Sequence, residues 1–242
     1  MTFNNRIILG GDFIGDEDGS EIISVIADSD FEDDNKGTYP DNLPILPLRN
    51  TVLFPGVVFP VTVGRDKSIK LIQDAYKGDK IIGVVAQKDQ NIEDPTAKDL
   101  YPVGTLAHIL KMLKMPDGNI TVIIQGKRKF KLDEITQEEP YFRGNITATT
   151  DSKANKGKET NATVSSIRDL ASQIVEVSPN IPSEASFALK NINSPNFLVN
   201  FISSNLNVSV DEKQEILELS VFKKKANRVL TYLDKELQML EL

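Results

Sequence analysis

The spacing of apolar residues changes once along the chain, and this change restricts the fold more than any other feature. Between residues 43 and 150 the apolar residues form short β-branched runs that are broken by Pro and Gly, as at Pro55-Gly56. From residue 162 onward they recur every three or four positions, as along residues 164–177. The first pattern predicts about six strands and one helix in a closed or folded-over sheet, and the second predicts helices alone. We therefore expect an α+β protein in which the sheet precedes a helical bundle.

The strand-rich half contains one strong hairpin signal. Val103–Met115 and Asn119–Gln125 flank Pro116-Asp117-Gly118, where Pro presets φ at the first corner and Gly supplies a positive φ. Pro60 lies in another apolar run and has no N–H to give to a ladder, so it is expected at a sheet edge or a bulge. The other elements expected in this half are a helix over 66–77 that stops at Gly78 and strands over 81–85, 130–135 and 142–149.

The helical half carries clear helix-start signals. Ser194-Pro195 combines an N-cap with Pro at the first helical position, and Ser209-Val210-Asp211-Glu212 is a capping box. Two earlier helices are expected over 164–177 and 183–191. A coiled-coil-like seam follows, which could pair with another chain or pack on its own lobe. It consists of Phe222, Ala226, Leu230, Leu233, Leu237 and Leu240. Because no stop signal follows the seam, the natural chain is expected to continue past Leu242.

The net charge of -7 belongs to one end of the chain. Residues 1–40 contain ten acidic and two basic residues, so the remaining residues sum to +1. A segment of this composition buries too little apolar surface to offset its ordering entropy, and it is expected to be a disordered, solvating tail. The expected parts are an acidic tail (1–42), a β-rich lobe (43–150), a linker (151–161), a helical lobe (162–219) and the beginning of a long coiled-coil-like helix (220–242).

Composition excludes several classes of site. The chain has no cysteine and a single histidine, His108, which rules out disulfides, thiolate metal sites, a Cys nucleophile and His-rich metal sites. No metal ligands are therefore expected, and His108 is interpreted as a packed or rim residue of a strand. No apolar run approaches the ~20 residues that a membrane span needs, and the first residues lack a signal-peptide core. A cytoplasmic protein with no membrane partner is expected.

Motifs for catalysis and nucleotide binding are missing from the sequence. Gly126-Lys127 and Gly157-Lys158 lack the hydroxyl residue and the earlier Gly that a phosphate-binding loop requires. There is no G-x-S-x-G nucleophile elbow. We therefore nominate no catalytic or nucleotide-binding residue. The basic run Lys127-Arg128-Lys129 is interpreted as a solvated face or a subunit contact, because only Phe130 could stack a base beside it.

The run LPILPLRNTVLFPG from Leu43 to Gly56 resembles the start of the N-terminal substrate-binding domain of the Lon protease family. The resemblance covers about residues 43–242. Further family-like segments follow in the same order as in the family, and these segments are Val63-Gly64-Arg65, Val85–Lys88, Val103-Gly104-Thr105, Pro116-Asp117-Gly118 and Ile181-Pro182. The sequence departs from the family pattern in its acidic extension over residues 1–40 and in Phe54, where some members carry Tyr.

The resemblance implies a β-rich, PUA-like pseudobarrel lobe, then a helical lobe whose last helix runs toward an ATPase module. It also implies cytoplasmic protein quality control by a hexamer that self-associates through the helical C-terminal part. In that setting this domain catches unfolded or tagged protein substrates. The family's ATPase loop and Ser-Lys protease dyad are absent from this chain. ATP and Mg are thus expected only in downstream domains, and this fragment is expected to need no cofactor and to catalyse no reaction.

Binding of unfolded protein requires exposed apolar surface with a polar rim, and the sequence offers two places for it. One is the turn-containing segment with Phe54, Val57 and Phe59, for which the alternative is simply core. The other is Met112, Leu113 and Met115 at the lip of the 116–118 hairpin, where Lys111 and Lys114 interleave the apolar residues. Met is unbranched and polarizable, so it adapts to many partners.

The favoured function is that of a Lon N-terminal fragment that recognises substrates and organises the hexamer. Two alternative functions stay open. A stand-alone LON-domain binding adaptor would have a stop codon just after Leu242, whereas a Lon protease would continue to a Gly-x4-Gly-Lys-Thr loop. An RNA-binding module is disfavoured by the near-neutral body and its few exposed aromatics. Salt-dependent binding of RNA would favour it again.

Overall fold

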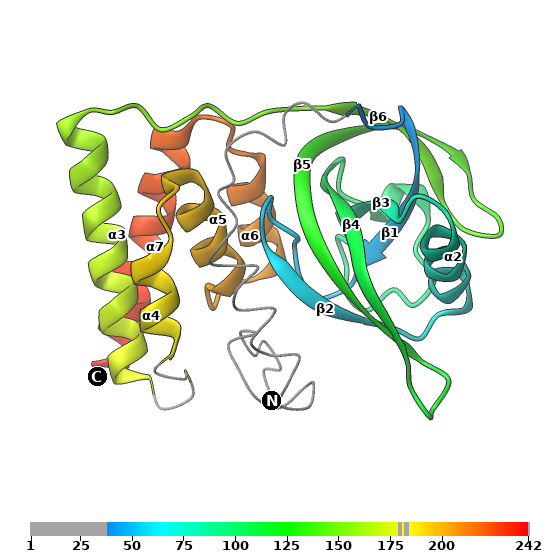
Figure 1. Ribbon diagram of the computed structural model, residues 1–242, viewed down its shortest axis with the longest axis horizontal. Coiled ribbons are helices and arrows are strands. Elements are labelled where there is room, and N and C mark those ends of the chain that lie inside the picture. The colour runs from blue at the N-terminus through cyan, green and yellow to red at the C-terminus, as the bar shows by residue number, and fades with distance from the viewer. Residues whose placement is uncertain (1–37, 179–180, 182–183, 242) are drawn as a thin grey trace. The chain divides into compact units, whose positions relative to one another are not determined.

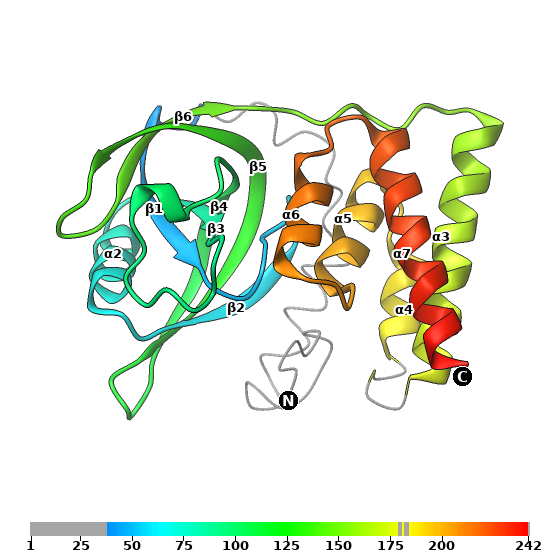
Figure 2. The same ribbon diagram turned by 180° about the vertical axis from the view of Figure 1, so that it is seen from behind.

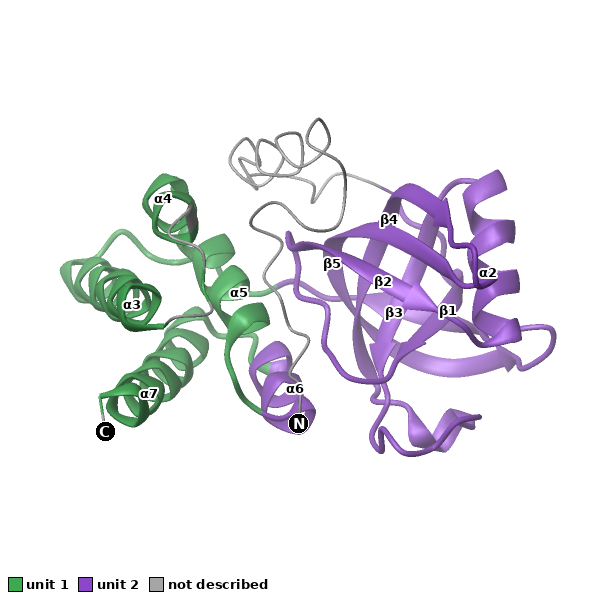
Figure 3. Ribbon diagram, turned by 90° about the horizontal axis from the view of Figure 1, so that it is seen from below, with its two compact units in different colours: residues 1–32, 151–208, 219–242 green, residues 33–150, 209–218 purple. Residues whose placement is uncertain are grey.

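The computed structural model describes residues 38–178, 181 and 184–241. The acidic tail lies almost wholly outside this part of the chain. The structure divides into two compact units (Figure 3). Unit 2 comprises residues 33–150 and 209–218, and unit 1 comprises residues 1–32, 151–208 and 219–242.

Unit 2 is built on one six-stranded sheet that curves back on itself (Figures 1 and 2). Its strands run in the order β2-β5-β4-β3-β1-β6, and β6 also pairs with β5, which closes the sheet. Only β1 and β3 are parallel neighbours. The strands are β1 (Asn42–Leu48), β2 (Val58–Val63), β3 (Ile81–Ala86), β4 (Val103–Lys114), β5 (Ile120–Gln137) and β6 (Arg143–Ala148). The expected six strands are confirmed, and Pro60 lies in the edge strand β2, as predicted.

One boundary differs from the sequence prediction. The strands expected over 119–125 and 130–135 are a single long strand, β5, which pairs with β2 through its first part and with β6 through its last part. Gly126 and the three basic residues after it stay within the strand, although the β4–β5 ladder shifts register here: Ala107 pairs with Gly126 and Thr105 with Lys129. Their backbone continues in strand geometry, and the strand bends enough to serve two partners.

Two apolar clusters fill unit 2. The larger lies between helix α2 (Asp66–Lys77) and the sheet, and it includes Leu71 and Ile72 of that helix. The smaller gathers residues of β1, β3, β4, β5 and β6 around Phe130. The helix predicted over 66–77 is confirmed, and the N–H of Gly78 bonds back to the carbonyls of Asp74 and Ala75 as the helix ends. A short 3-10 helix, η2 (Ala97–Asp99), completes the loops of this unit.

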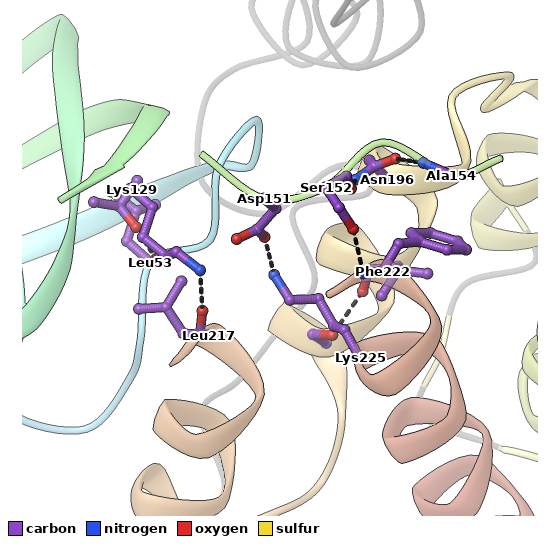
Figure 4. A network of polar contacts seen from close by, with 12 residues as sticks. Leu53, Lys129, Asp151, Ser152, Ala154, Asn196, Leu217, Phe222 and Lys225 are labelled. Atoms are coloured by element: carbon purple, nitrogen blue, oxygen red, sulfur yellow. Dashed lines mark hydrogen bonds and ion pairs between the residues drawn. The ribbon is translucent and has the colours of Figure 1, made fainter. Parts of the chain in front are cut away.

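Helix α6 (Val210–Glu218) belongs to unit 2 and is attached to the sheet by polar contacts. The Lys129 Nζ atom donates a hydrogen bond of 3.0 Å to the carbonyl oxygen of Leu217 in the last turn of α6 (Figure 4). Gln214 Nε2 donates to the carbonyl oxygen of Val103 at 2.9 Å. The side chain of Lys129 is buried. The interpretation of the basic run as a solvated face is therefore wrong for Lys129, which neutralises a helix C-terminus inside the fold.

We expect Lys129→Met to lower the free energy of unfolding by about 2 kcal/mol, the usual contribution of a hydrogen bond with one charged partner. Met keeps much of the apolar volume but leaves the Leu217 carbonyl without this donor. Urea unfolding measures the change. Lys131→Met is the matched control, since Lys131 lies two residues further along the same strand and is exposed; its effect should stay within about 0.5 kcal/mol. Equal losses in the two variants would contradict the assignment.

The regular elements in the described part of unit 1 are all helices. They are α3 (Lys158–Val177), α4 (Glu184–Asn191), α5 (Pro195–Asn205) and α7 (Phe222–Leu240). The predicted N-cap at Ser194 is confirmed, because its Oγ accepts a hydrogen bond from the Phe197 N–H at 3.3 Å. Helix α3 begins at Lys158, inside the stretch that was expected to be a linker. The sequence did not reveal this start, because the first turns of the helix are polar and exposed and show no apolar periodicity.

The apolar seam of α7 packs along α3 within unit 1. Phe222, Ala226, Leu233 and Leu237 are buried, as the seam requires. Val229 is buried in place of the expected Leu230, and Leu240 is 41% exposed. Of the two alternatives for the seam, the structure therefore shows packing on its own lobe.

The start of α7 is tied to the segment that enters unit 1. Lys225 forms a buried ion pair with Asp151 (Figure 4). Ser152 Oγ accepts a hydrogen bond from the Phe222 N–H at 2.8 Å, and the Ser152 N–H donates to the Ser220 carbonyl at 2.7 Å. The first turn of α7 thus depends on residues about 70 positions earlier in the sequence.

Candidate functional site

The hairpin between β4 and β5 projects from the sheet of unit 2 (Figure 1). Its turn is held by the Gly118 N–H, which donates to the Met115 carbonyl at 3.1 Å, and by the Met115 N–H, which donates to the Asn119 carbonyl at 2.9 Å. Gly118 has φ +89°, as the predicted turn requires. Asp117 accepts hydrogen bonds from the backbone and side chain of Asn119. The hairpin signal read from the sequence is confirmed, and its tip has a fixed geometry.

The apolar side chains of this hairpin face different surroundings. Met115 is 43% exposed at the tip, and Leu113 is partly exposed. Met112 is partly buried and packs against the larger core cluster. Lys111 precedes Met112 and Lys114 follows Leu113, so the two lysines flank these two apolar residues along the strand. The outward apolar surface of the hairpin therefore comes from Met115 and Leu113, while Met112 also supports the core.

The other candidate segment lies mostly inside unit 2. Phe54 and Val57 are buried, with 0% and 4% of their surface exposed, and Phe59 is partly buried against the larger core cluster. Gly56 has φ +88°, and the Val57 N–H donates to the Phe54 carbonyl, so Pro55-Gly56 makes the expected turn. The core interpretation holds for Phe54 and Val57.

A polar cluster at the loops of the sheet has a structural explanation. The Arg65 guanidinium donates hydrogen bonds to the carbonyls of Pro47 and Glu93 and to the Gln87 side chain. Gln87 is buried and donates to the carbonyls of Asp89 and Ile92. Burial lowers the pKa of Arg65, and the nearby charge of Arg49 lowers it further. These donors satisfy loop carbonyls, which accounts for their burial without any ligand.

Chemistry for catalysis is not apparent in the described residues. They contain no group of three His, Asp or Glu side chains arranged to hold a metal ion. His108 is partly buried in β4, as expected of a rim residue. Unit 1 has a small, mostly apolar cavity of about 60 Å³ between α3, α4, α5 and α7, well below the roughly 300 Å³ of a small-molecule site. A wider depression of about 540 Å³ between α3 and α7 is open to solvent. Within the described ranges no helix has the length and apolarity needed to cross a bilayer.

Sequence reasoning missed one feature of the site. Among the strands that the structure describes, β2 has β5 as its only neighbour, so one edge of β2 carries no partner strand from these residues. The Pro60 signal pointed to an edge, but sequence spacing could not tell which side of β2 would stay open. This edge runs beside the base of the β4–β5 hairpin, because β2 pairs with residues 120–125 of β5.

Comparison with known sequences gives a consistent family. Residues 42–235 match the model of the ATP-dependent protease La (LON) substrate-binding domain. The Lon protease of Flavobacterium johnsoniae is 52% identical over 224 residues, which cover 92% of this chain and 27% of that protein. The Lon protease of Cytophaga hutchinsonii is 44% identical over 228 residues, which cover 94% of this chain and 28% of that protein. The chain thus spans little more than a quarter of these relatives.

Solved structures share the fold. The N-terminal domain of Mycobacterium avium complex Lon protease has a TM-score of 0.65 and 16% identity, covering 80% of this chain and 98% of that one. The Lon N-terminal domain protein from Xanthomonas campestris has a TM-score of 0.57 and 16% identity, covering 78% of this chain and 97% of that one. The α+β fold expected from the sequence is therefore confirmed.

Proposed function

Because the chain belongs to the Lon protease family and carries its substrate-binding domain, we propose that it captures protein substrates through apolar segments that unfolded or tagged proteins expose. The observation that carries this proposal is the projecting β4–β5 hairpin. Its tip presents Met115 and Leu113 on a turn held by backbone and Asp117 hydrogen bonds. Exposed apolar residues on a rigid support, with lysines beside them, suit binding of many apolar sequences at low entropic cost.

The parent protein is proposed to be an ATP-dependent serine protease that degrades misfolded and regulatory proteins in the cytoplasm. Its ATPase and protease steps would belong to the remaining three quarters of the relatives' length. This chain would contribute substrate capture and the organisation of a hexamer through its helical C-terminal part. Exposed apolar residues at the end of α7, Met239 and Leu240, support self-association there.

We expect Met115→Ser to weaken binding of a permanently unfolded probe, reduced and carboxymethylated α-lactalbumin, by about fivefold. The reason is that the variant loses about 1 kcal/mol of apolar contact with the probe. Its melting temperature should stay close to that of the wild type, because Met115 lies at the exposed tip of the hairpin and outside the two core clusters. Fluorescence anisotropy of the labelled probe measures the dissociation constant.

Two further variants serve as controls for Met115→Ser. Val177→Ser removes an apolar side chain of unit 1 that is 47% exposed, close to the exposure of Met115, and should leave probe binding unchanged. Met112→Ala removes a side chain that packs on the core and should lower the free energy of unfolding by about 1 to 2 kcal/mol. If Met115→Ser binds the probe as tightly as the wild type, the hairpin is not the capture surface.

A further inference from the structure

The sheet of unit 2 has one unpaired edge within the described part of the chain. Strands β1, β3, β4, β5 and β6 each have at least two neighbours, whereas β2 pairs with β5 alone. All six residues of β2 take part in this pairing, from Val58 opposite Gln125 to Val63 opposite Ile120, without a register shift. One side of β2 is thus regular strand backbone without a partner strand.

Two observations determine which backbone groups point to this free edge. Pro60 has no N–H, so within an uninterrupted ladder it belongs at a position that faces away from β5. The Val57 carbonyl accepts a hydrogen bond from the Gly126 N–H at 2.8 Å, so the odd-numbered position just before the strand faces β5. Because the direction alternates along an antiparallel pair, Val58, Pro60 and Thr62 face outward. Val58 is buried, so the part of the edge that solvent reaches offers the N–H group of Thr62 and the carbonyls of Pro60 and Thr62.

These outward groups have no hydrogen-bond partner among the described residues. Outside the β2–β5 ladder, the backbone groups of residues 58–63 form no hydrogen bond with any described residue. The one side-chain bond of β2 joins Thr62 Oγ1 to Thr121 Oγ1 and leaves the backbone groups unused. Thr62 is exposed, and Phe59 and Val61 are only partly buried. Solvent therefore reaches the middle of this strand, whereas its end residues, Val58 and Val63, are buried.

We propose that the free edge of β2 binds an extended segment of an unfolded substrate protein as an additional β-strand. This inference rests on the proposed function and adds the mode of capture. Alternating N–H and C=O groups along an edge complement the backbone of an extended chain, whatever its side chains. Phe59 and Val61 add apolar contacts that favour β-branched and aromatic substrate residues. Folded proteins already pair most of their strand backbone, so such an edge selects for unfolded segments.

A second copy of this chain fits the edge less well. If two β2 strands paired antiparallel about a two-fold axis through the middle of the strand, Pro60 of one copy would lie at or near Pro60 of the other. The centre of that pairing would then lack both donors. An unfolded chain can choose a register that avoids this loss. An unfolded substrate segment is therefore the partner that fits the free edge of β2 better than a second copy of this chain.

The first test uses the full chain and the unfolded α-lactalbumin probe. Thr62→Pro removes the outward N–H of Thr62, whereas Thr62→Val keeps the backbone and removes only the hydroxyl. We expect Thr62→Pro to weaken probe binding by about tenfold and Thr62→Val by less than about twofold. In the wild type, the amide of Thr62 should exchange hydrogen more slowly when the probe is present. Equal binding by both variants, with unchanged exchange, would overturn the proposal.

A second test leaves the protein unaltered and so does not depend on the folding of a variant. The probe is a ten-residue peptide of alternating Val and Thr in three forms. One form is unmodified, one is N-methylated at every second residue, which blocks one edge of the extended peptide, and one is N-methylated at every residue, which blocks both edges. Methylation of one edge leaves the other edge able to pair, so that peptide should bind as the unmodified one does. Methylation of both edges should weaken binding by at least about tenfold. Undiminished binding of the doubly blocked peptide would refute strand addition.

The outcomes separate the inference from the proposed function. If the chain binds neither the unfolded protein nor the peptide, the proposed function fails and the inference fails with it. If the chain binds both, but neither Thr62→Pro nor methylation matters, the function stands and the edge is not its site. If Thr62→Pro instead lowers the mass of the protein in sedimentation without any probe, a second copy occupies the edge and the proposal is wrong.

Discussion

Gly126→Ala is expected to lower the free energy of unfolding by about 3 kcal/mol, because the added methyl group would overlap a backbone atom that has no room to move. A Cβ at residue 126 falls well inside the contact distance of the Phe54 carbonyl oxygen. Two hydrogen bonds hold that backbone in place. The Gly56 N–H donates to the Gly126 carbonyl at 2.9 Å, and the Gly126 N–H donates to the Val57 carbonyl at 2.8 Å.

Relief of this overlap would break those hydrogen bonds or move Phe54, which is fully buried. Gly78→Ala is the matched control in the same unit, because its Cβ would make only ordinary contacts of 3.5 and 3.6 Å with helix carbonyls. Its effect should stay below about 1 kcal/mol. Urea unfolding of the two variants gives the comparison. A Gly126→Ala protein as stable as Gly78→Ala would show that the turn at Pro55-Gly56 yields easily.

The same contact explains why sequence periodicity failed near residue 126. Gly126 and the three basic residues after it interrupt the apolar pattern, so the sequence prediction ends one strand at Gln125 and begins the next at Phe130. Here Gly126 is needed for the close approach of the Phe54 backbone, and Lys129 is needed inside the fold as a donor to Leu217. Both are long-range requirements, across about 70 and 88 residues. A local pattern carries no information about either, so the single strand β5 and the burial of Lys129 could not be predicted.

Elements with local causes were predicted well. Helix α2 has an apolar stripe that ends at Gly78, the 116–118 hairpin has a Pro and a Gly at the corners that need them, and α5 has its Ser194 cap. Each signal lies within a few residues of its effect. The same holds for Ser209 and Glu212, whose side chains form the reciprocal hydrogen bonds of a capping box.

The candidate site shows how one irregularity changes a prediction. Strict alternation from the buried Ile109 would place Lys111 toward the core and Met112 outward. The β4–β5 ladder has a register shift between Ile109 and Lys111, which brings Met112 to the core face with Ile109. Met115 follows as the exposed residue of the tip. Because bulges leave little trace in composition, the sequence identified the hairpin but could not assign the direction of each side chain.

Asp151→Ala is expected to lower the free energy of unfolding of unit 1 by about 4 kcal/mol, since it leaves the Lys225 ammonium buried without its carboxylate. The side chains of Lys225 and Asp151 are 4% and 14% exposed. An ammonium at such a site has lost most of its hydration and depends on the opposite charge. The pair also lies beside the Ser152 hydrogen bond to the Phe222 N–H, so its loss would loosen the first turn of α7.

The double variant Asp151→Ala with Lys225→Met decides whether charge or packing causes that loss. Removing both charges removes the desolvation cost as well, so the double variant should recover at least about 2 kcal/mol relative to Asp151→Ala alone. Lys223 and Glu159 form an exposed pair in the same unit, at 65% and 75% side-chain exposure, and Lys223→Met should change stability by less than about 1 kcal/mol. Additive losses in the double variant would mean that the two side chains act through independent contacts. A recovery would identify the buried pair as the electrostatic link between the entry segment of unit 1 and its last helix.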